Sequence, residues 1–116
     1  MSRIIRTNSD AVLSSAVEYH GFVYTSGIVP RDTAAGIHAQ TRDVLDQIDE
    51  LLETHGTDKT RLLQAQIWLK SIGDRASFNE IWSAWLPEAA APVRACVEAP
   101  LAHPDYLVEI MITACK

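Results

Sequence analysis

The fold class is decided by the stretch Leu63-Gln64-Ala65-Gln66-Ile67-Trp68-Leu69-Lys70, whose side chains alternate with a period of two. The four apolar residues at odd positions, from Leu63 to Leu69, then lie on one face, which is typical of a β-strand with one side buried. Helical patterns precede and follow this stretch. It therefore predicts a strand between two helices, and a parallel crossover connection is possible here.

The two flanking helices follow from apolar periodicity. Residues 37–55 carry apolar side chains at helical spacing, and Gly56 suits the position after the helix end, where left-handed backbone is common. Asp74 is expected to cap a second helix that ends before Pro87. Its apolar residues fall at i, i+3, i+4 and i+7, and they are Phe78, Ile81, Trp82 and Trp85. We expect this face to pack on the sheet.

Further strands are expected at both ends of the chain, over residues 3–6, 12–19, 22–27, 93–99 and 106–114. His20-Gly21 predicts a two-residue hairpin turn, because Gly adopts positive φ freely and His tolerates it. Together the elements predict one α+β domain over residues 1–116, with a mostly antiparallel sheet of about six strands and both helices on one face. Nothing remains to cover the other sheet face, so we expect copies of the chain to associate through it.

The amino-acid composition disfavours several classes of function without strictly excluding them. With 15 acidic and 10 basic residues among 116 and a net charge of −5, the chain has no basic excess for a phosphate backbone, so nucleic acid is not the expected partner. Its two cysteines form no CxxC pair, and its four histidines show no metal-ligand spacing. No apolar run approaches the roughly 18 residues of a membrane span. We expect a reduced, cytoplasmic protein that needs no metal.

Two charged residues fall inside the closing strands. Arg94 alternates onto one side with Cys96 and Glu98, and a guanidinium in mid-strand requires an anionic partner or water. A salt bridge is the commoner fate of such an arginine, whereas a ligand carboxylate would suit its planar fork of donors. Glu109 stands among apolar neighbours, which either raises its pKa toward the range of acid–base catalysis or simply places it beside a basic residue.

The other candidates carry weaker signals. Cys96 shows no sign of activation, so an inert thiol is expected rather than a nucleophile. Ser26-Gly27 at a strand end either offers a hydroxyl and a backbone N–H to a ligand or only begins the turn into Pro30. For Asn79, the alternative is an ordinary exposed polar residue of the second helix. The sequence contains no phosphate loop, nucleophile elbow or dinucleotide fingerprint.

Several ordered motifs resemble the RidA (YjgF) family of imine deaminases. They are the run Phe22-Val23-Tyr24-Thr25-Ser26-Gly27-Ile28-Val29-Pro30, similar to the family's TSGxxP segment, then Gln40-Thr41 to Leu45, Phe78-Asn79 with Trp82, Ala91 to Glu98, and Val108-Glu109-Ile110. The resemblance spans nearly the whole chain. It implies a chorismate-mutase-like fold and a homotrimer with ligand clefts between adjacent subunits. It also implies hydrolysis of reactive 2-imino acids, and their enamine tautomers, to 2-keto acids and ammonia without a cofactor.

When the family's functional residues are matched to this sequence position by position, the resemblance implies a role for each candidate residue. Arg94 would bind the substrate carboxylate, and Glu109 would orient and deprotonate the attacking water, helped by the backbone at Cys96. Ser26 and Gly27 would line the cleft. Asn79 would support it.

The match also departs from the family pattern. Leu13 stands where deaminating members have a tyrosine, and the connections from Gly27 to the first helix and from Asn79 to Arg94 are short. These features are similar to the branch represented by YoaB and leave the substrate open. The alternatives are a non-catalytic trimer that binds a small carboxylate metabolite as a regulator, and a ribonuclease, which the acidic composition disfavours.

Overall fold

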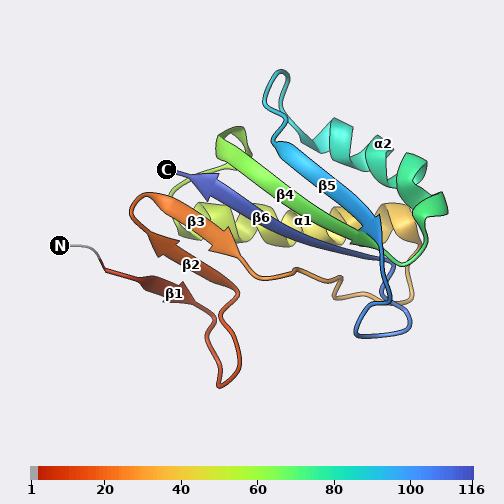
Figure 1. The fold of residues 1–116 in the computed structure, drawn as a ribbon, viewed down its shortest axis with the longest axis horizontal. Coiled ribbons are helices and arrows are strands. Elements are labelled where there is room, and N and C mark those ends of the chain that lie inside the picture. Colours follow the sequence, from red (N-terminus) through yellow and green to blue (C-terminus); the bar gives the residue numbers. More distant parts are fainter. Residues whose placement is uncertain (1–2) are drawn as a thin grey trace.

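The structure is a computed structural model that describes residues 3–116 and contains a six-stranded sheet with two α-helices packed on one face (Figure 1). The strands are β1 (Ile5–Thr7), β2 (Ala16–Tyr19), β3 (Phe22–Thr25), β4 (Leu62–Leu69), β5 (Val93–Glu98) and β6 (Val108–Cys115). The helices are α1 (Ile37–Thr54) and α2 (Arg75–Trp85). The expected α+β class and the expected layer arrangement are confirmed.

The sheet order is β1-β2-β3-β6-β4-β5, and every neighbouring pair is antiparallel except β4 with β5. Since β3 and β4 are each antiparallel to β6, they run parallel to one another on either side of it, and α1 connects them. The helix α2 makes a second crossover from β4 to β5. The parallel crossover that the central stretch allowed is therefore present, in a sheet that is otherwise antiparallel.

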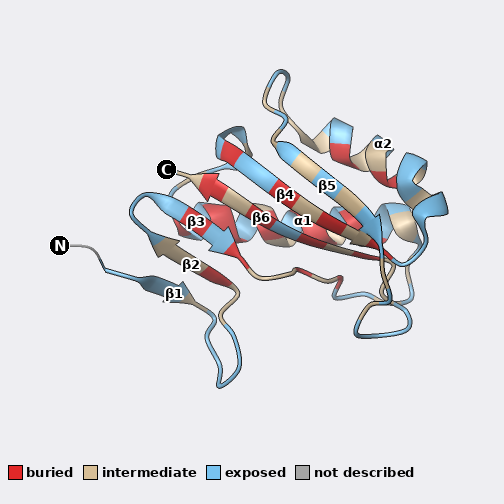
Figure 2. Cartoon of the chain, viewed as in Figure 1, coloured by how far each residue is buried: buried red, intermediate tan, exposed pale blue. Residues whose placement is uncertain are grey.

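The core lies between the sheet and the helices. Three apolar residues of β4 are paired with three of β6, and all six are at most 2% exposed: Ala65 with Ile112, Ile67 with Ile110, and Leu69 with Val108. Helix α1 adds a buried stripe, and α2 adds the buried rings of Phe78 and Trp82. Buried residues alternate with intermediate or exposed ones along most of β4 and all of β6 (Figure 2), so only one face of the sheet is covered.

The predicted alternation of buried and exposed side chains is wrong at one end of β4. The ladder to β6 shifts register between Leu62 and Gln64, which turns Leu62 into the core at 7% exposure and leaves Leu63 outside at 42%. A bulge inserts one residue and reverses the faces before it. A strict period of two cannot predict this reversal, so the assignment of Leu63 to the apolar face is corrected.

The N-terminal strands are shorter than expected. The carboxylate of Asp10 accepts hydrogen bonds from the backbone N–H groups of Val12 and Leu13, at 2.7 and 2.9 Å, so residues 12–15 form a loop before β2. An aspartate that pairs with its own following backbone favours such a turn over a strand. The strand expected over 3–6 lies at Ile5–Thr7 instead.

The turn predictions are mostly confirmed. His20 and Gly21 have φ of 50° and 79°, as a tight hairpin turn requires, and Gly56 has φ of 73° after α1. Asp74 does precede α2, but its side chain makes no capping hydrogen bond. The 3₁₀ turn Ile72–Asp74 leads directly into the helix, so Asp74 already has helical backbone and the predicted side-chain cap is wrong.

The sheet face opposite the helices is open in the single chain. It carries large apolar side chains that are 39–71% exposed, namely Tyr19, Phe22, Tyr24, Val93, Val97 and Met111. An open apolar face of this extent is characteristic of an interaction surface. No helix among residues 3–116 has the length and apolar character needed to cross a bilayer.

Candidate functional site

Arg94 lies on the helix side of the sheet edge. It is paired with Ala65, a core residue of β4, so its side chain projects toward α2. The guanidinium carbon is 5.7 Å from the ring centroid of Phe78 and 5.8 Å from that of Trp82, and Nη1 donates a hydrogen bond of 2.8 Å to Oδ1 of Asn79. Helix α2 thus fixes the plane of the guanidinium through two aromatic rings and one amide.

This half-buried cation has no carboxylate beside it. None of residues 3–116 forms an ion pair with Arg94, and one of its five N–H donors is used by Asn79. The salt bridge within one chain, which was the commoner alternative for a strand arginine, is therefore not formed. A partly desolvated guanidinium with free donors is suited to an external anion.

Cys96 follows on the same side of β5 and is also half-buried. Burial raises the pKa of its thiol, and the positive charges of Arg94 and Arg75 oppose this rise only in part. A thiol with a raised pKa is a poor nucleophile at neutral pH. The expectation of an unactivated thiol is consistent with this environment.

Glu109 lies on β6, where it is paired with Trp68 of β4, and its side chain projects to the face away from the helices. Its carboxylate packs against Gly27: a Cβ at that position would lie 2.0 Å from Oε2 of Glu109. Burial raises the pKa of this carboxyl group, and none of residues 3–116 donates a hydrogen bond to it or forms an ion pair with it. The carboxylate of Glu109 therefore takes up a proton more readily than the carboxylate of an exposed glutamate does.

The segment beyond β3 holds Gly27 against this carboxylate. Ile28 and Ile110 exchange two backbone hydrogen bonds of 2.8 and 3.1 Å, and the N–H of Ser26 donates to the carbonyl of Ser15 at 2.9 Å. Within the described part of the chain, the hydroxyl of Ser26 and the N–H of Gly27 have no hydrogen-bond partner. The N–H of Gly27 is therefore available to a ligand beside Glu109, and the hydroxyl of Ser26 is available on the residue before it.

The two sets of residues lie on opposite faces of one sheet. We call Asn79, Arg94 and Cys96 the arginine cluster, and Ser26, Gly27 and Glu109 the glutamate cluster. Ala65 neighbours Arg94 on the helix side, whereas Trp68 neighbours Glu109 on the open side. A single chain therefore does not bring Arg94 and Glu109 together. Alternation within each strand did not reveal this arrangement, because it depends on how β5 and β6 are each aligned with β4.

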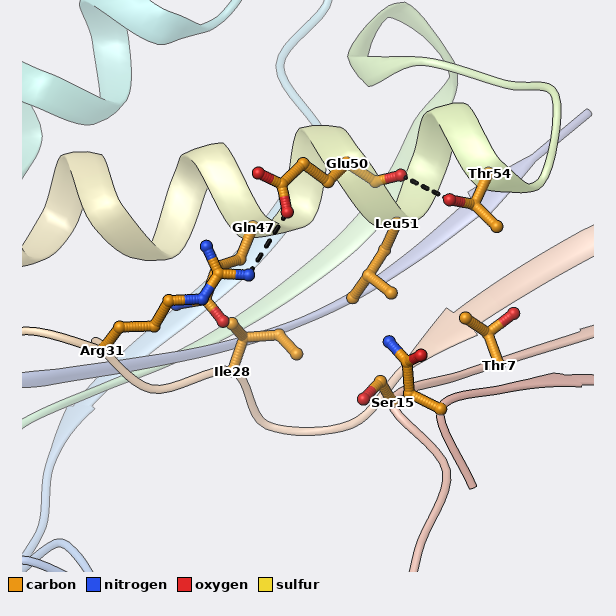
Figure 3. Close-up of a pocket in the computed structure, with 9 residues that line it drawn as sticks. Thr7, Ser15, Ile28, Arg31, Gln47, Glu50, Leu51 and Thr54 are labelled. Carbon is orange, nitrogen blue, oxygen red and sulfur yellow. Dashed lines mark hydrogen bonds and ion pairs between the residues drawn. The ribbon is translucent and has the colours of Figure 1, made fainter. Parts of the chain in front are cut away.

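A cavity that sequence reasoning missed lies between α1 and the N-terminal strands. It has a volume of about 320 Å³ and is lined by Thr7, Asn8, Ser15, Ile28, Arg31, Gln47, Glu50, Leu51 and Thr54 (Figure 3). Arg31 and Glu50 form an exposed ion pair of 3.3 Å at its wall. None of the six predicted site residues lines this cavity.

Leu13 stands at the position of the resembled family's tyrosine. It is 51% exposed in the loop before β2, next to Val12, which is 87% exposed. No cluster of three or more His, Cys, Asp or Glu side chains within residues 3–116 is arranged to hold a metal ion.

The chain is thus an α+β subunit with a half-buried arginine on one sheet face and a glutamate on the other, neither of which has an ion-pair partner among residues 3–116. The Endoribonuclease L-PSP family model matches residues 5–116, and the chain belongs to this family. The RutC family protein YoaB of Escherichia coli is 40% identical over 111 residues, which is 96% of both chains. A RutC family protein of Haemophilus ducreyi is 40% identical over 98% of this chain and 95% of its own.

A solved structure supports the same family and fold. A member of the YjgF protein family from Neisseria meningitidis superimposes with a TM-score of 0.95 at 43% identity, over 98% of this chain and 95% of that chain. The resemblance to the RidA (YjgF) family and its YoaB branch is thereby confirmed.

Proposed function

We propose that this protein is a cytoplasmic enzyme that hydrolyses 2-imino acids and their enamine tautomers to 2-keto acids and ammonia. The observation that carries the proposal is the half-buried guanidinium of Arg94, which two aromatic rings and Asn79 hold in place without an anionic partner. A substrate carboxylate supplies the missing anion. Membership of the Endoribonuclease L-PSP family is compatible with this chemistry.

In this proposal the arginine cluster binds and orients the substrate. The free N–H donors of Arg94 hold the carboxylate through parallel hydrogen bonds, so the adjacent imine carbon has a fixed position. Asn79 and the rings of Phe78 and Trp82 prevent the guanidinium from rotating. Orientation of this kind is one of the larger contributions that a binding site makes to rate.

Glu109 acts on water. Its burial raises its pKa, so the carboxylate is a stronger base than an exposed glutamate. The carboxylate removes a proton from water, and the oxygen attacks the imine carbon while the C=N electrons move to nitrogen, which is protonated. The resulting carbinolamine loses ammonia as the C=O bond forms. Imine and water are thus converted to ketone and ammonia without a cofactor, because the imine carbon is already electrophilic.

Two copies of the chain are needed for one such site. Since the two clusters face opposite sides of the sheet, the glutamate cluster of one subunit must meet the arginine cluster of a neighbour. We propose a homotrimer that closes its open apolar sheet faces around an axis and leaves a cleft at each junction. Ser26 and Gly27 would line this cleft beside Glu109.

A second candidate is a non-catalytic trimer that binds a small carboxylate metabolite and acts as a regulator. It is favoured by Leu13, which provides no hydroxyl at the position where the resembled family has a tyrosine. In that case Arg94 would bind the carboxylate but Glu109 would move no proton.

The test is the release of keto acid and ammonia from 2-imino acids that an amino-acid oxidase generates in situ. Wild-type protein and Arg42→Ala, which alters an exposed arginine of α1, are expected to accelerate hydrolysis, whereas Arg94→Ala and Glu109→Gln are not. Titration with the keto acid separates the roles, because Glu109→Gln should retain binding that Arg94→Ala loses. Binding by the wild type without acceleration, across several side-chain sizes, would leave the regulator as the better account.

A further inference from the structure

Four polar side chains form a connected group at the C-terminal end of α1, apart from both clusters described above. His55, the residue directly after α1, has a side chain only 2% exposed. Its Nε2 lies 2.9 Å from Oγ1 of Thr7 on β1, and its Nδ1 lies 2.9 Å from Oε1 of Glu18 on β2. The second oxygen of Glu18 accepts from Nζ of Lys116 at 3.0 Å.

The direction of these hydrogen bonds can be deduced. The pKa of Glu18 is lowered, first by its hydrogen bond to His55 and then by that to Lys116, so Glu18 is an ionised acceptor. The proton between Glu18 and His55 therefore lies on Nδ1. In the neutral imidazole Nε2 is then an acceptor, so the hydroxyl of Thr7 donates to it. A hydroxyl, an imidazole base and an orienting carboxylate in this order form the arrangement that activates a nucleophile.

The surroundings also favour the charge that such a step creates. When Nε2 takes the hydroxyl proton, the imidazole becomes a cation beside the carboxylate of Glu18. It also lies at the C-terminal end of an 18-residue helix, where the backbone carbonyls favour positive charge.

Thr7 is accessible from two cavities. One has a volume of about 370 Å³ and is lined by Ile5, Thr7, Glu18, Thr54, His55, Gly56 and Lys116. The other is the cavity of Figure 3, in which Thr7 is drawn at the end nearest β1. These volumes are within the lower range for sites that bind small organic molecules, about 300–1,000 Å³. A short acyl group with its leaving group fits this size.

We propose that Thr7 is the nucleophile of a second site, which takes small activated acyl esters as substrates. Oγ1 of Thr7 bonds to the carbonyl carbon and its proton passes to Nε2 of His55. The C–O bond to the leaving group then breaks as His55 gives this proton to the leaving oxygen, which yields an acyl-threonine, a released alcohol or phenol and a neutral imidazole. Water, deprotonated by His55, then attacks the acyl carbon and releases the carboxylic acid, and Thr7 regains its proton. This site is independent of Arg94 and Glu109 and does not rest on imine hydrolysis.

The test uses the full chain with 4-nitrophenyl acetate, read by nitrophenol release and by peptide mass spectrometry for acetyl-Thr7. Thr7→Val keeps the shape of the side chain but lacks the hydroxyl, so acylation should fall about a hundredfold, while Thr7→Ser should retain it. His55→Gln, which keeps polar contacts but is not a base, should also lose it. Thr54→Val is the matched control, because Thr54 lines both cavities but its hydroxyl donates to the backbone carbonyl of Glu50.

Nitrophenol release by Thr54→Val at the wild-type rate and an acetyl group on Thr7 would support the site. An unchanged rate in Thr7→Val, or acetyl groups found only on lysines, would overturn it and leave a network that ties β1 and β2 to α1. Thermal unfolding of each variant establishes that the chain is folded, and imine hydrolysis by Thr7→Val is expected to be unaffected.

Discussion

Gly27 determines where the carboxylate of Glu109 can lie. The oxygen Oε2 occupies the space that a side chain at this position would need, since a Cβ there would be 2.0 Å from it. Glycine is therefore required at position 27 because the carboxylate of Glu109 approaches the backbone so closely. The sequence indicated Ser26-Gly27 as a possible ligand site, but the contact with Glu109 comes from a residue 82 positions later and depends on the alignment of the segment after β3 with β6.

Gly27→Ala is predicted to displace the carboxylate and to lower kcat/KM for imine hydrolysis by about tenfold or more, because small misplacements of a catalytic group are costly. Gly36→Ala is the matched control: Gly36 lies directly before α1, and its added Cβ would meet no atom within 4 Å. Steady-state kinetics and thermal unfolding of both variants check the prediction. Equal activity of the two would show that Glu109 tolerates displacement or has no part in catalysis.

The raised pKa of Glu109 predicts a pH dependence. The carboxylate is the active base, so kcat/KM should fall as the pH decreases through the pKa of Glu109. Because burial raises that pKa, the acidic limb should lie above the value of about 4.3 for a free glutamate. A pH–rate profile measures it, with Arg42→Ala as control. An acidic limb at or below the ordinary glutamate value would contradict the environment described for Glu109.

At the scale of elements, Gln40 joins α1 to the loop that precedes β6. Its side chain is fully buried, its Oε1 accepts from the N–H of Leu107 at 2.8 Å, and its Nε2 donates to the carbonyls of Ala35 and Asp105 at 3.0 and 2.9 Å. One amide thus satisfies three backbone groups. Because Leu107 directly precedes β6, this contact also fixes the start of the strand that carries Glu109.

Gln40→Leu should lower the free energy of unfolding by about 1–3 kcal/mol, because the N–H of Leu107 and the carbonyl of Asp105 lose the hydrogen bonds that a fully buried amide makes with them. Ala39→Leu adds the same side chain at the neighbouring exposed position of α1 and should change stability little. Urea unfolding of the two variants makes the comparison. A similar stability for both would mean that water replaces the amide at no cost.

The elements themselves were largely predictable, because apolar periodicity is local. Both helices, the hairpin at His20-Gly21 and the closing strands follow from patterns within about 18 residues or fewer. The predictions were wrong where interactions other than apolar burial determine the backbone. These places are the register shift at Leu62 and the hydrogen-bonded loop around Asp10. The group around His55 was missed for a similar reason, since its partners Glu18 and Thr7 are 37 and 48 residues away.

For the whole molecule, the open sheet face is the feature that favours association of copies of the chain. The apolar residues that a monomer leaves in water lie on the same face as Glu109. Burying them contributes roughly 25 cal/mol per Å² of apolar area removed from water, which favours association. Sequence reasoning predicted the uncovered face from the count of elements, but not the position of Arg94 on the opposite side.

Met111→Glu is predicted to dissociate the assembly, because it places a charge within the apolar face, two residues from Glu109 on the same side of β6. Sedimentation velocity should show a smaller species, with imine hydrolysis lost in parallel. Ala39→Glu, which adds a carboxylate to an exposed position of α1, should leave the assembly intact. An unchanged oligomer in Met111→Glu would show that copies do not meet through this face.

The most direct test of the central claim mixes two inactive variants. Arg94→Ala and Glu109→Gln are unfolded, refolded together in equal amounts, and assayed for imine hydrolysis beside each variant refolded alone. If Arg94 and Glu109 of one site come from different copies, random mixing should restore about a quarter of the wild-type activity, because that fraction of junctions pairs an intact arginine with an intact glutamate. Activity in the mixture no greater than in the separate variants would contradict a site shared between subunits.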